Sequence, residues 1–224
     1  MVEPAAHRHT TTFETQIPLQ ALLDGPELPG VLRRALTRTI SREQRQLLTI
    51  GESLRRWQTP ILREWITGLL AHDIGIEFID TNGERTWNHI STLFAEQRLD
   101  QVSISAIDIP MLAQNEAFGA AYIARAPGDV AIVNAAAFLI LDASQRVQSS
   151  FVYVSGASQQ PIMPINLWTL RDNPLDEANI GSAVKVVAPQ VDPVGDDLAS
   201  ADDRRELARE VVQNALLECL EQRS

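Results

Sequence analysis

The chain has 224 residues and 45% apolar content, which is enough for one large domain or two small ones with proper cores. Its formal net charge of -10 argues against nucleic acid as a main partner, because the phosphate backbone attracts basic surfaces. The single cysteine, Cys219, excludes a disulfide framework and a cysteine-held iron–sulfur cluster within this chain.

The first third of the chain predicts a polar start followed by helices. Residues 1–28 are polar, irregular and turn-rich, and they predict a loose N-terminal leader. Apolar residues at helical spacing predict a short helix over residues 29–40 and a second helix that starts near Pro60. Between them, residues 47–51 predict a brief buried strand that ends at a glycine turn.

The next segment predicts a hairpin. Residues 76–79 and 85–90 form the two strands, and Asn82-Gly83 between them is a strong hairpin dipeptide. Residues 91–96 predict a short helix, and residues 102–109 predict a strand that Pro110 ends.

A boundary near residues 112–128 precedes a second β-rich part. Residues 130–141 and 147–154 predict an antiparallel pair, and Ser200 with an acid three residues later predicts the capped start of a final helix. Alternation in the first strand places small residues on one face, where another element can approach closely. This face carries Ala131, Val133, Ala135 and Ala137, and the other carries Val130, Ile132, Asn134, Ala136 and Phe138.

Charge is unevenly spread along the chain. Residues 33–63 are rich in arginine, and the part from Asp172 onward is strongly acidic. A basic patch suits an anionic ligand such as a dinucleotide, or an acidic partner surface, whereas a solvated arginine face explains the same pattern. The histidines lack metal-ligand spacing with carboxylates, and the serines lack a histidine and acid set, so we expect no metal site and assign no catalytic residue.

No segment approaches the length of a transmembrane helix, and the start lacks a signal-peptide core. We therefore expect a cytoplasmic protein without membrane insertion.

Several short motifs follow one another in a characteristic order. They are Thr49-Ile50-Gly51-Glu52, Leu69-Leu70-Ala71, Gly83-Glu84-Arg85, Ile107-Asp108-Ile109-Pro110, the run from Arg125 to Asn134, Gly156 with Pro161, and Asp197 with Ser200-Ala201 and Asp203-Arg204. In this order they resemble the FAD-carrying medium subunits of the molybdenum hydroxylases, the family of carbon monoxide dehydrogenase and xanthine dehydrogenase. The resemblance runs from about residue 29 to residue 222.

The resemblance implies an α+β fold in two parts. Residues 29–110 would be a remnant of the second lobe of a PCMH-type FAD-binding domain. Residues 117–222 would be a CO dehydrogenase flavoprotein C-terminal-like domain, a three-stranded antiparallel sheet with helices. The family's N-terminal FAD lobe is not expected here, because only about 28 residues precede the match and the sequence has no Gly-Gly pair.

The resemblance also implies a function and a site. The function would be that of an FAD-binding, electron-transferring flavoprotein subunit of a molybdopterin-dependent oxidoreductase, with iron–sulfur and molybdopterin subunits, or further copies of itself, as partners. Thr49, Ile50, Gly51 and Ser53 would form a phosphate loop, and the same residues also suit a simple strand end and turn. Arg45 or Arg55 would offset phosphate charge, and Glu64 would accept from a ribose or ribityl hydroxyl.

Departures from the family pattern support an alternative. Glu52 stands where the family has a second glycine, so a carboxylate would meet the pyrophosphate. The chain would then be a degenerate, non-catalytic scaffold or assembly subunit that no longer binds FAD. An unrelated α+β binding module is a third reading, and whether this chain takes part in turnover is left open.

Overall fold

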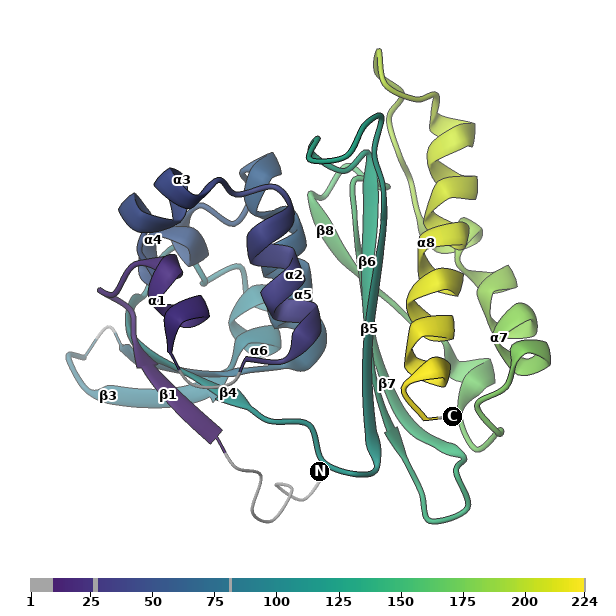
Figure 1. Cartoon of the computed structure of the whole chain (residues 1–224), viewed down its shortest axis with the longest axis horizontal. Helices are drawn as coiled ribbons and strands as arrows, with labels where there is room; N and C mark the ends of the chain where they lie inside the picture. Colours follow the sequence, from purple (N-terminus) through teal and green to yellow (C-terminus); the bar gives the residue numbers. More distant parts are fainter. Residues whose placement is uncertain (1–9, 26–27, 81, 224) are drawn as a thin grey trace.

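The computed structural model describes residues 10–25, 28–80 and 82–223, and two antiparallel sheets organise them (Figure 1). The N-terminal sheet has the strand order β1-β4-β2-β3. Its strands are β1 (Thr10–Glu14), β4 (Ser103–Pro110), β2 (Gly75–Ile79) and β3 (Arg85–His89). The predicted hairpin about Asn82-Gly83 is confirmed, since Ile79 pairs with Arg85 and Gly75 with His89.

Short helices pack on this sheet and complete the N-terminal part. The predicted helix over residues 29–40 is confirmed, and buried Val31, Leu32 and Leu36 hold it against the core. The helices here are α1 (Leu19–Asp24), α2 (Gly30–Arg38), α3 (Arg42–Leu47), α4 (Ile50–Arg55), α5 (Arg63–His72) and α6 (Ile90–Ala95), and a 3-10 turn at Pro60–Leu62 leads into α5.

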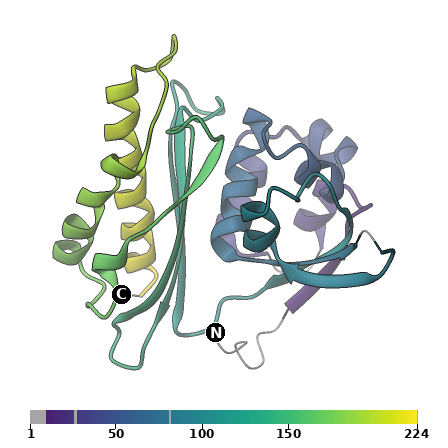
Figure 2. The ribbon, with the colours of Figure 1, turned by 180° about the vertical axis from the view of Figure 1, so that it is seen from behind.

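The second sheet stands between two helical layers. Its order is β5-β6-β7-β8, with β5 (Glu116–Ile123), β6 (Val133–Leu141), β7 (Val147–Ser155) and β8 (Ile162–Ile165). The views of Figures 1 and 2 show α8 (Ala201–Glu221) on one face, with α7 (Glu177–Ala183) beside it, and α5 and α2 on the other. Short 3-10 turns occur at Trp168–Leu170, Val184–Val186 and Ala188–Gln190.

Successive side chains of β6 point alternately into two hydrophobic clusters, as the sequence predicts. Val133, Ala135 and Ala137 lie in the cluster under α8. Ala136 and Phe138 lie in the cluster shared with the N-terminal helices, so one continuous core joins both parts of the chain. Small side chains bring α8 close to the sheet: a Cβ added at Gly119 would lie 2.1 Å from the carbonyl oxygen of Ala215.

Three expectations from the sequence need correction. The α+β class is confirmed, but the second sheet has four strands, because β5 lies inside the predicted boundary segment. Within the predicted loose leader, residues 10–14 form β1 and residues 19–24 form α1, with Leu19 and Leu22 fully buried; residues 1–9 and 26–27 lie outside the described part. The predicted strand over residues 47–51 is the junction between α3 and α4.

Candidate functional site

The predicted phosphate loop is the capped start of α4. Thr49 is the N-cap, and its hydroxyl accepts a hydrogen bond from the backbone N–H of Glu52 at 3.2 Å. The Glu52 carboxylate in turn accepts from the Thr49 backbone N–H at 3.0 Å. This reciprocal capping box explains why the segment is helical. It also lowers the pKa of Glu52, through the hydrogen bonds from the Thr49 backbone and side chain.

The N-terminal segment closes the same turn from the other side. The backbone N–H of Ile50 donates to the carbonyl of Ile17 at 3.0 Å, and that of Gly51 donates to the carbonyl of Thr15 at 2.9 Å. The Ser53 N–H completes the first helical bond, to Thr49, at 3.0 Å. Every backbone N–H from residue 49 to residue 53 is therefore already bonded within the chain.

The side chains of the loop are also committed. Ser53 is fully buried; its hydroxyl donates to the carbonyl of Ile50 at 2.7 Å and accepts from the indole N–H of Trp65 at 3.1 Å. A Cβ added at Gly51 would lie 3.1 Å from the Cβ of Thr15, so the glycine faces packed protein. Gly51 here serves close packing of β1 on α4, a role its sequence context does not reveal.

Arg45 and Glu64 have partners elsewhere, and the structure does not bring them together with the loop. The Arg45 guanidinium donates to the side chain of Gln20 at 3.0 Å and to the carbonyls of Leu36 and Ile40, which ties the end of α2 to α3. Glu64, in the first turn of α5, forms a half-buried ion pair with Arg38 of α2, with 2.6 Å between the Arg38 Nε and a Glu64 carboxylate oxygen.

The Arg38–Glu64 pair lies beside a pocket that sequence reasoning missed. The Arg38 guanidinium also sits 3.7 Å from the Tyr122 ring centroid and donates to the carbonyl of Asp129 at 2.8 Å. Burial lowers the pKa of Arg38, and Tyr122 and Asp129 act in the opposite direction. The pocket has a volume of about 290 Å³ and lies between α2, the start of α5, and strands β5 and β6. Its wall is rich in alanine, with Ala35, Ala120, Ala121, Ala135 and Ala136.

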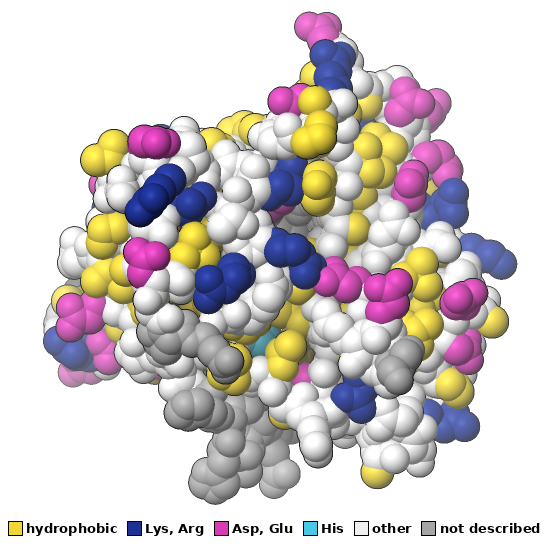
Figure 3. Space-filling model, viewed as in Figure 1, with side chains coloured by type: hydrophobic (Ala, Val, Ile, Leu, Met, Phe, Trp, Pro, Cys, Tyr) yellow, Lys and Arg dark blue, Asp and Glu magenta, His cyan; other side chains and the backbone are white. Residues whose placement is uncertain are grey.

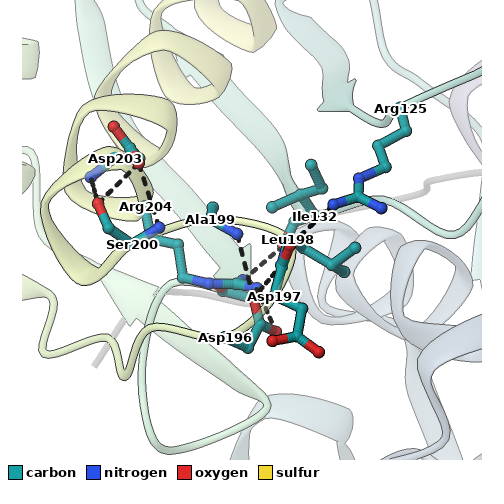
Figure 4. Close-up of polar contacts among 10 residues, drawn as sticks. Arg125, Ile132, Asp196, Asp197, Leu198, Ala199, Ser200, Asp203 and Arg204 are labelled. Carbon is teal, nitrogen blue, oxygen red and sulfur yellow. Dashed lines mark hydrogen bonds and ion pairs between the residues drawn. The ribbon is translucent and has the colours of Figure 1, made fainter.

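A second polar cluster fixes the start of α8 (Figure 4). Arg204 is buried and donates to both carboxylate oxygens of Asp196 at 2.7 Å and to the carbonyls of Ile132 and Gly156. The hydrogen bonds from Arg204 lower the pKa of Asp196 to about 2. Asp196, rather than the Asp197 quoted for the family motif, is thus the carboxylate that holds Arg204; the carbonyl of Asp197 accepts from Arg125 at 2.8 Å.

Arg63 carries a positive charge next to this cluster, and its buried Nε has no hydrogen-bond partner among the described residues. It lines a pocket of about 370 Å³ together with Asp196 and Arg204. Burial lowers the pKa of Arg63, and the nearby charge of Arg204 adds to the effect.

The surface reflects the uneven charge of the sequence. In Figure 3, basic side chains gather over the helical N-terminal part, while acidic ones are more frequent over the C-terminal part on the right.

No group of three or more His, Cys, Asp or Glu residues placed to hold a metal ion occurs within residues 10–25, 28–80 and 82–223. Of the helices in these ranges, none has the length and apolarity that crossing a membrane requires.

Comparison with solved structures identifies the class of fold. The chain resembles a chain of quinoline 2-oxidoreductase from Pseudomonas putida 86, with a TM-score of 0.78 and 17% identity over 97% of this chain and 77% of that one. It resembles equally a chain of carbon monoxide dehydrogenase from Hydrogenophaga pseudoflava, with a TM-score of 0.81 and 16% identity over 96% of this chain and 77% of that one. The fold is therefore one found in these oxidoreductases.

A family model matches the C-terminal part of the chain. Residues 120–219 match the model of the CO dehydrogenase flavoprotein C-terminal domain. The resemblance predicted from the sequence motifs is thereby confirmed. No curated protein matches the sequence.

Proposed function

We propose that this chain is a relative of the molybdenum hydroxylase flavoprotein subunits that serves as a non-catalytic scaffold or assembly subunit. Of the two readings that the sequence leaves open, the geometry favours this one over an FAD-binding, electron-transferring subunit. The partners would be iron–sulfur and molybdopterin subunits of a hydroxylase-type complex, and the expected location is the cytoplasm.

The observation that supports the proposal is the complete use of donors in the predicted phosphate loop. A pyrophosphate is bound by free backbone N–H groups that point at its oxygens. Here the N–H groups of residues 49–53 donate to Glu52, Ile17, Thr15 and Thr49 instead. The residues assigned to FAD therefore do not fit its pyrophosphate, and no electron-transfer step is derived through the cofactor.

The charges around the turn, like its hydrogen bonds, disfavour a bound pyrophosphate. The Glu52 carboxylate lies in the first turn of α4, where a phosphate would need positive potential, and it already accepts the N–H of the capping residue Thr49. Two like charges a few ångströms apart repel by about 1 kcal/mol in water, and by several times more at the lower effective dielectric constant of a protein site. Arg45, the residue expected to offset phosphate charge, is bonded to Gln20 and two carbonyls.

One observation favours a second possibility, that this chain binds the flavin ring of FAD but not its phosphates. The alanine-lined pocket between α2, α5 and the second sheet is largely apolar, with Arg38 and Asn134 among its polar lining residues. Such a pocket suits a planar heterocycle with a polar edge. In that case the ring would be held by this chain and the phosphates by another chain.

The visible absorption spectrum of the purified chain tests the proposal, together with an assay of flavin released on denaturation. We expect a colourless protein and no released flavin. A flavin spectrum near one equivalent would contradict the proposal and restore the electron-transferring reading, since Glu52 would then have to turn away from the phosphates.

A further inference from the structure

An aromatic pocket lies apart from the predicted flavin site, between the α6 segment and strands β7 and β8. Its volume is about 510 Å³. Trp57, Phe94 and Tyr153 line it, and consecutive rings meet edge to face, with centroids 5.1 Å apart for Trp57 and Phe94 and 6.3 Å apart for Phe94 and Tyr153. These rings come from three separate parts of the sequence, so the fold itself assembles the pocket.

Tyr153 brings a hydrogen-bonding group to this pocket. Its side chain is only 8% exposed. The hydroxyl is not one of the fully buried side-chain atoms that lack a partner among the described residues, so it keeps access to solvent and can donate to a ligand in the pocket. Burial and the charge of Asp73 raise the pKa of Tyr153 to about 12, so the hydroxyl stays protonated and able to donate.

The remaining polar lining consists of amides. Gln58, Gln97, Gln101 and Gln160 line the pocket. Gln97 has the left-handed backbone φ of 55°, which is uncommon for a non-glycine residue, and the Gln101 amide donates to its carbonyl at 2.8 Å. Carboxamides can both donate to and accept from a polar ligand edge.

The charge at the pocket selects among ligands. Within the described lining, Asp100 is the charged residue, and the charge of Asp73, which is not part of the lining, also acts on Tyr153. Arg98, next to the pocket in sequence, pairs with Glu96 at 2.9 Å. Negative charge without a lining cation disfavours anions. Aromatic rings and amides favour a planar ring with polar substituents.

We propose that this pocket binds an uncharged, planar nitrogen heterocycle that carries a carboxamide-like edge, with Tyr153 donating to that edge and Trp57 and Phe94 contacting the ring. The proposal goes beyond the scaffold function and does not depend on it. It assigns a ligand-binding role to a part of the chain that has none in the flavin reading.

Isothermal titration of the full chain with nicotinamide and with nicotinate tests this assignment, because the two probes share a shape and differ in charge. We expect nicotinamide to bind and nicotinate to bind more weakly. Tyr153→Phe should weaken nicotinamide binding by about three- to tenfold, the loss of one hydrogen bond. Asp100→Asn should strengthen nicotinate binding and leave nicotinamide binding nearly unchanged.

Tyr122→Phe is the matched control, because Tyr122 is the chain's other tyrosine and lines the alanine-rich pocket instead. It should leave nicotinamide binding unchanged. The assignment is overturned if the unmodified chain does not bind nicotinamide, if Tyr153→Phe binds it equally well, or if Tyr122→Phe is the variant that loses it. Neither probe contains a flavin or a phosphate, so failure here is distinguishable from failure of the scaffold proposal.

Discussion

The backbone N–H of Gly51 donates to the carbonyl of Thr15 at 2.9 Å, and this bond joins the N-terminal segment to the turn where a flavoprotein relative would be expected to hold phosphate. Thr15 is itself fixed, since its N–H donates to the carbonyl of Ser105 at 3.0 Å and its hydroxyl to the carbonyl of Ile104 at 2.6 Å. The turn is therefore anchored to the sheet rather than open to a ligand.

Substitution of Gly51 by alanine should be destabilising relative to the same change at Gly181. Both glycines are helical, and a Cβ at Gly181 meets nothing within 4 Å, so Gly181→Ala should stabilise the fold by about 0.5–1 kcal/mol. At Gly51 the Cβ would press on the fixed Thr15 at 3.1 Å, which should remove this gain. Urea denaturation of both variants measures the difference, and equal stabilisation would show that Thr15 can move.

The capping box of α4 should contribute measurably to stability. Thr49→Ala removes the hydroxyl that accepts from the Glu52 N–H and should lower the free energy of unfolding by about 1 kcal/mol. Thr37→Ala is the control, because Thr37 is an exposed threonine inside α2 and not a cap; its effect should stay within about 0.5 kcal/mol. Equal effects of the two changes in urea denaturation would argue against the cap.

Ser53 separates a structural role from a phosphate-binding role. In Ser53→Ala the buried indole N–H of Trp65 loses its acceptor, and the free energy of unfolding should fall by about 1–3 kcal/mol. Neither protein should bind FAD in fluorescence quenching at a temperature where both are folded. FAD binding by the unmodified chain that is lost in a variant of unchanged stability would support the phosphate-loop prediction instead.

Much of the architecture is predictable from local sequence, because the signals are strong there. Asn82-Gly83 specifies the β2–β3 hairpin, Ser200 with Asp203 specifies the start of α8, and the alternation of β6 specifies both core faces. The order of the motifs was sufficient to predict the family of the C-terminal half.

Elements that depend on distant contacts could not be predicted in this way. Strand β1 buries few residues and is defined by its pairing with β4, about ninety residues later. Strand β5 is rich in alanine and glycine, which have low strand propensity, and it needs Gly119 because α8 approaches there. In the predicted phosphate loop, the backbone N–H of Gly51 is occupied by a hydrogen bond to the carbonyl of Thr15, and nothing in the sequence near Gly51 indicates that contact.

The ion pair of Asp196 with Arg204 should make stability depend on acidic pH. Arg204 holds the pKa of Asp196 at about 2, below its ordinary value of 3.8. Because the folded-state pKa is depressed, the stabilisation is present above pH 3.8 and is lost as the pH falls through about 2. The difference in urea midpoint between the unmodified chain and Asp196→Asn should therefore be largest at neutral pH and shrink over this interval.

Asp197→Asn is the control for this pH series, because it leaves the Arg204 partner in place. A midpoint difference for Asp196→Asn that persists unchanged at the acid end would contradict the role assigned to the pair.

Close packing of α8 on the second sheet should tolerate no side chain at Gly119. An added Cβ would meet the backbone carbonyl of Ala215 at 2.1 Å, so Gly119→Ala must displace the helix. We expect a loss of about 1–3 kcal/mol in the free energy of unfolding, as for other overpacked cores. Gly30→Ala, where nothing lies within 4 Å, is the comparison, and similar stability of the two variants would mean that α8 sits farther from β5.

A parallel titration with FAD and riboflavin tests the central claim, that the turn at residues 49–53 does not grip a pyrophosphate. Both ligands carry the flavin ring, and FAD adds the phosphates. If the backbone donors stay committed to Thr15, Ile17, Thr49 and Glu52, FAD should bind no more tightly than riboflavin. Binding of FAD at one equivalent and about a hundredfold more tightly than riboflavin would contradict the account, because that gain requires several charge-assisted hydrogen bonds to the phosphates.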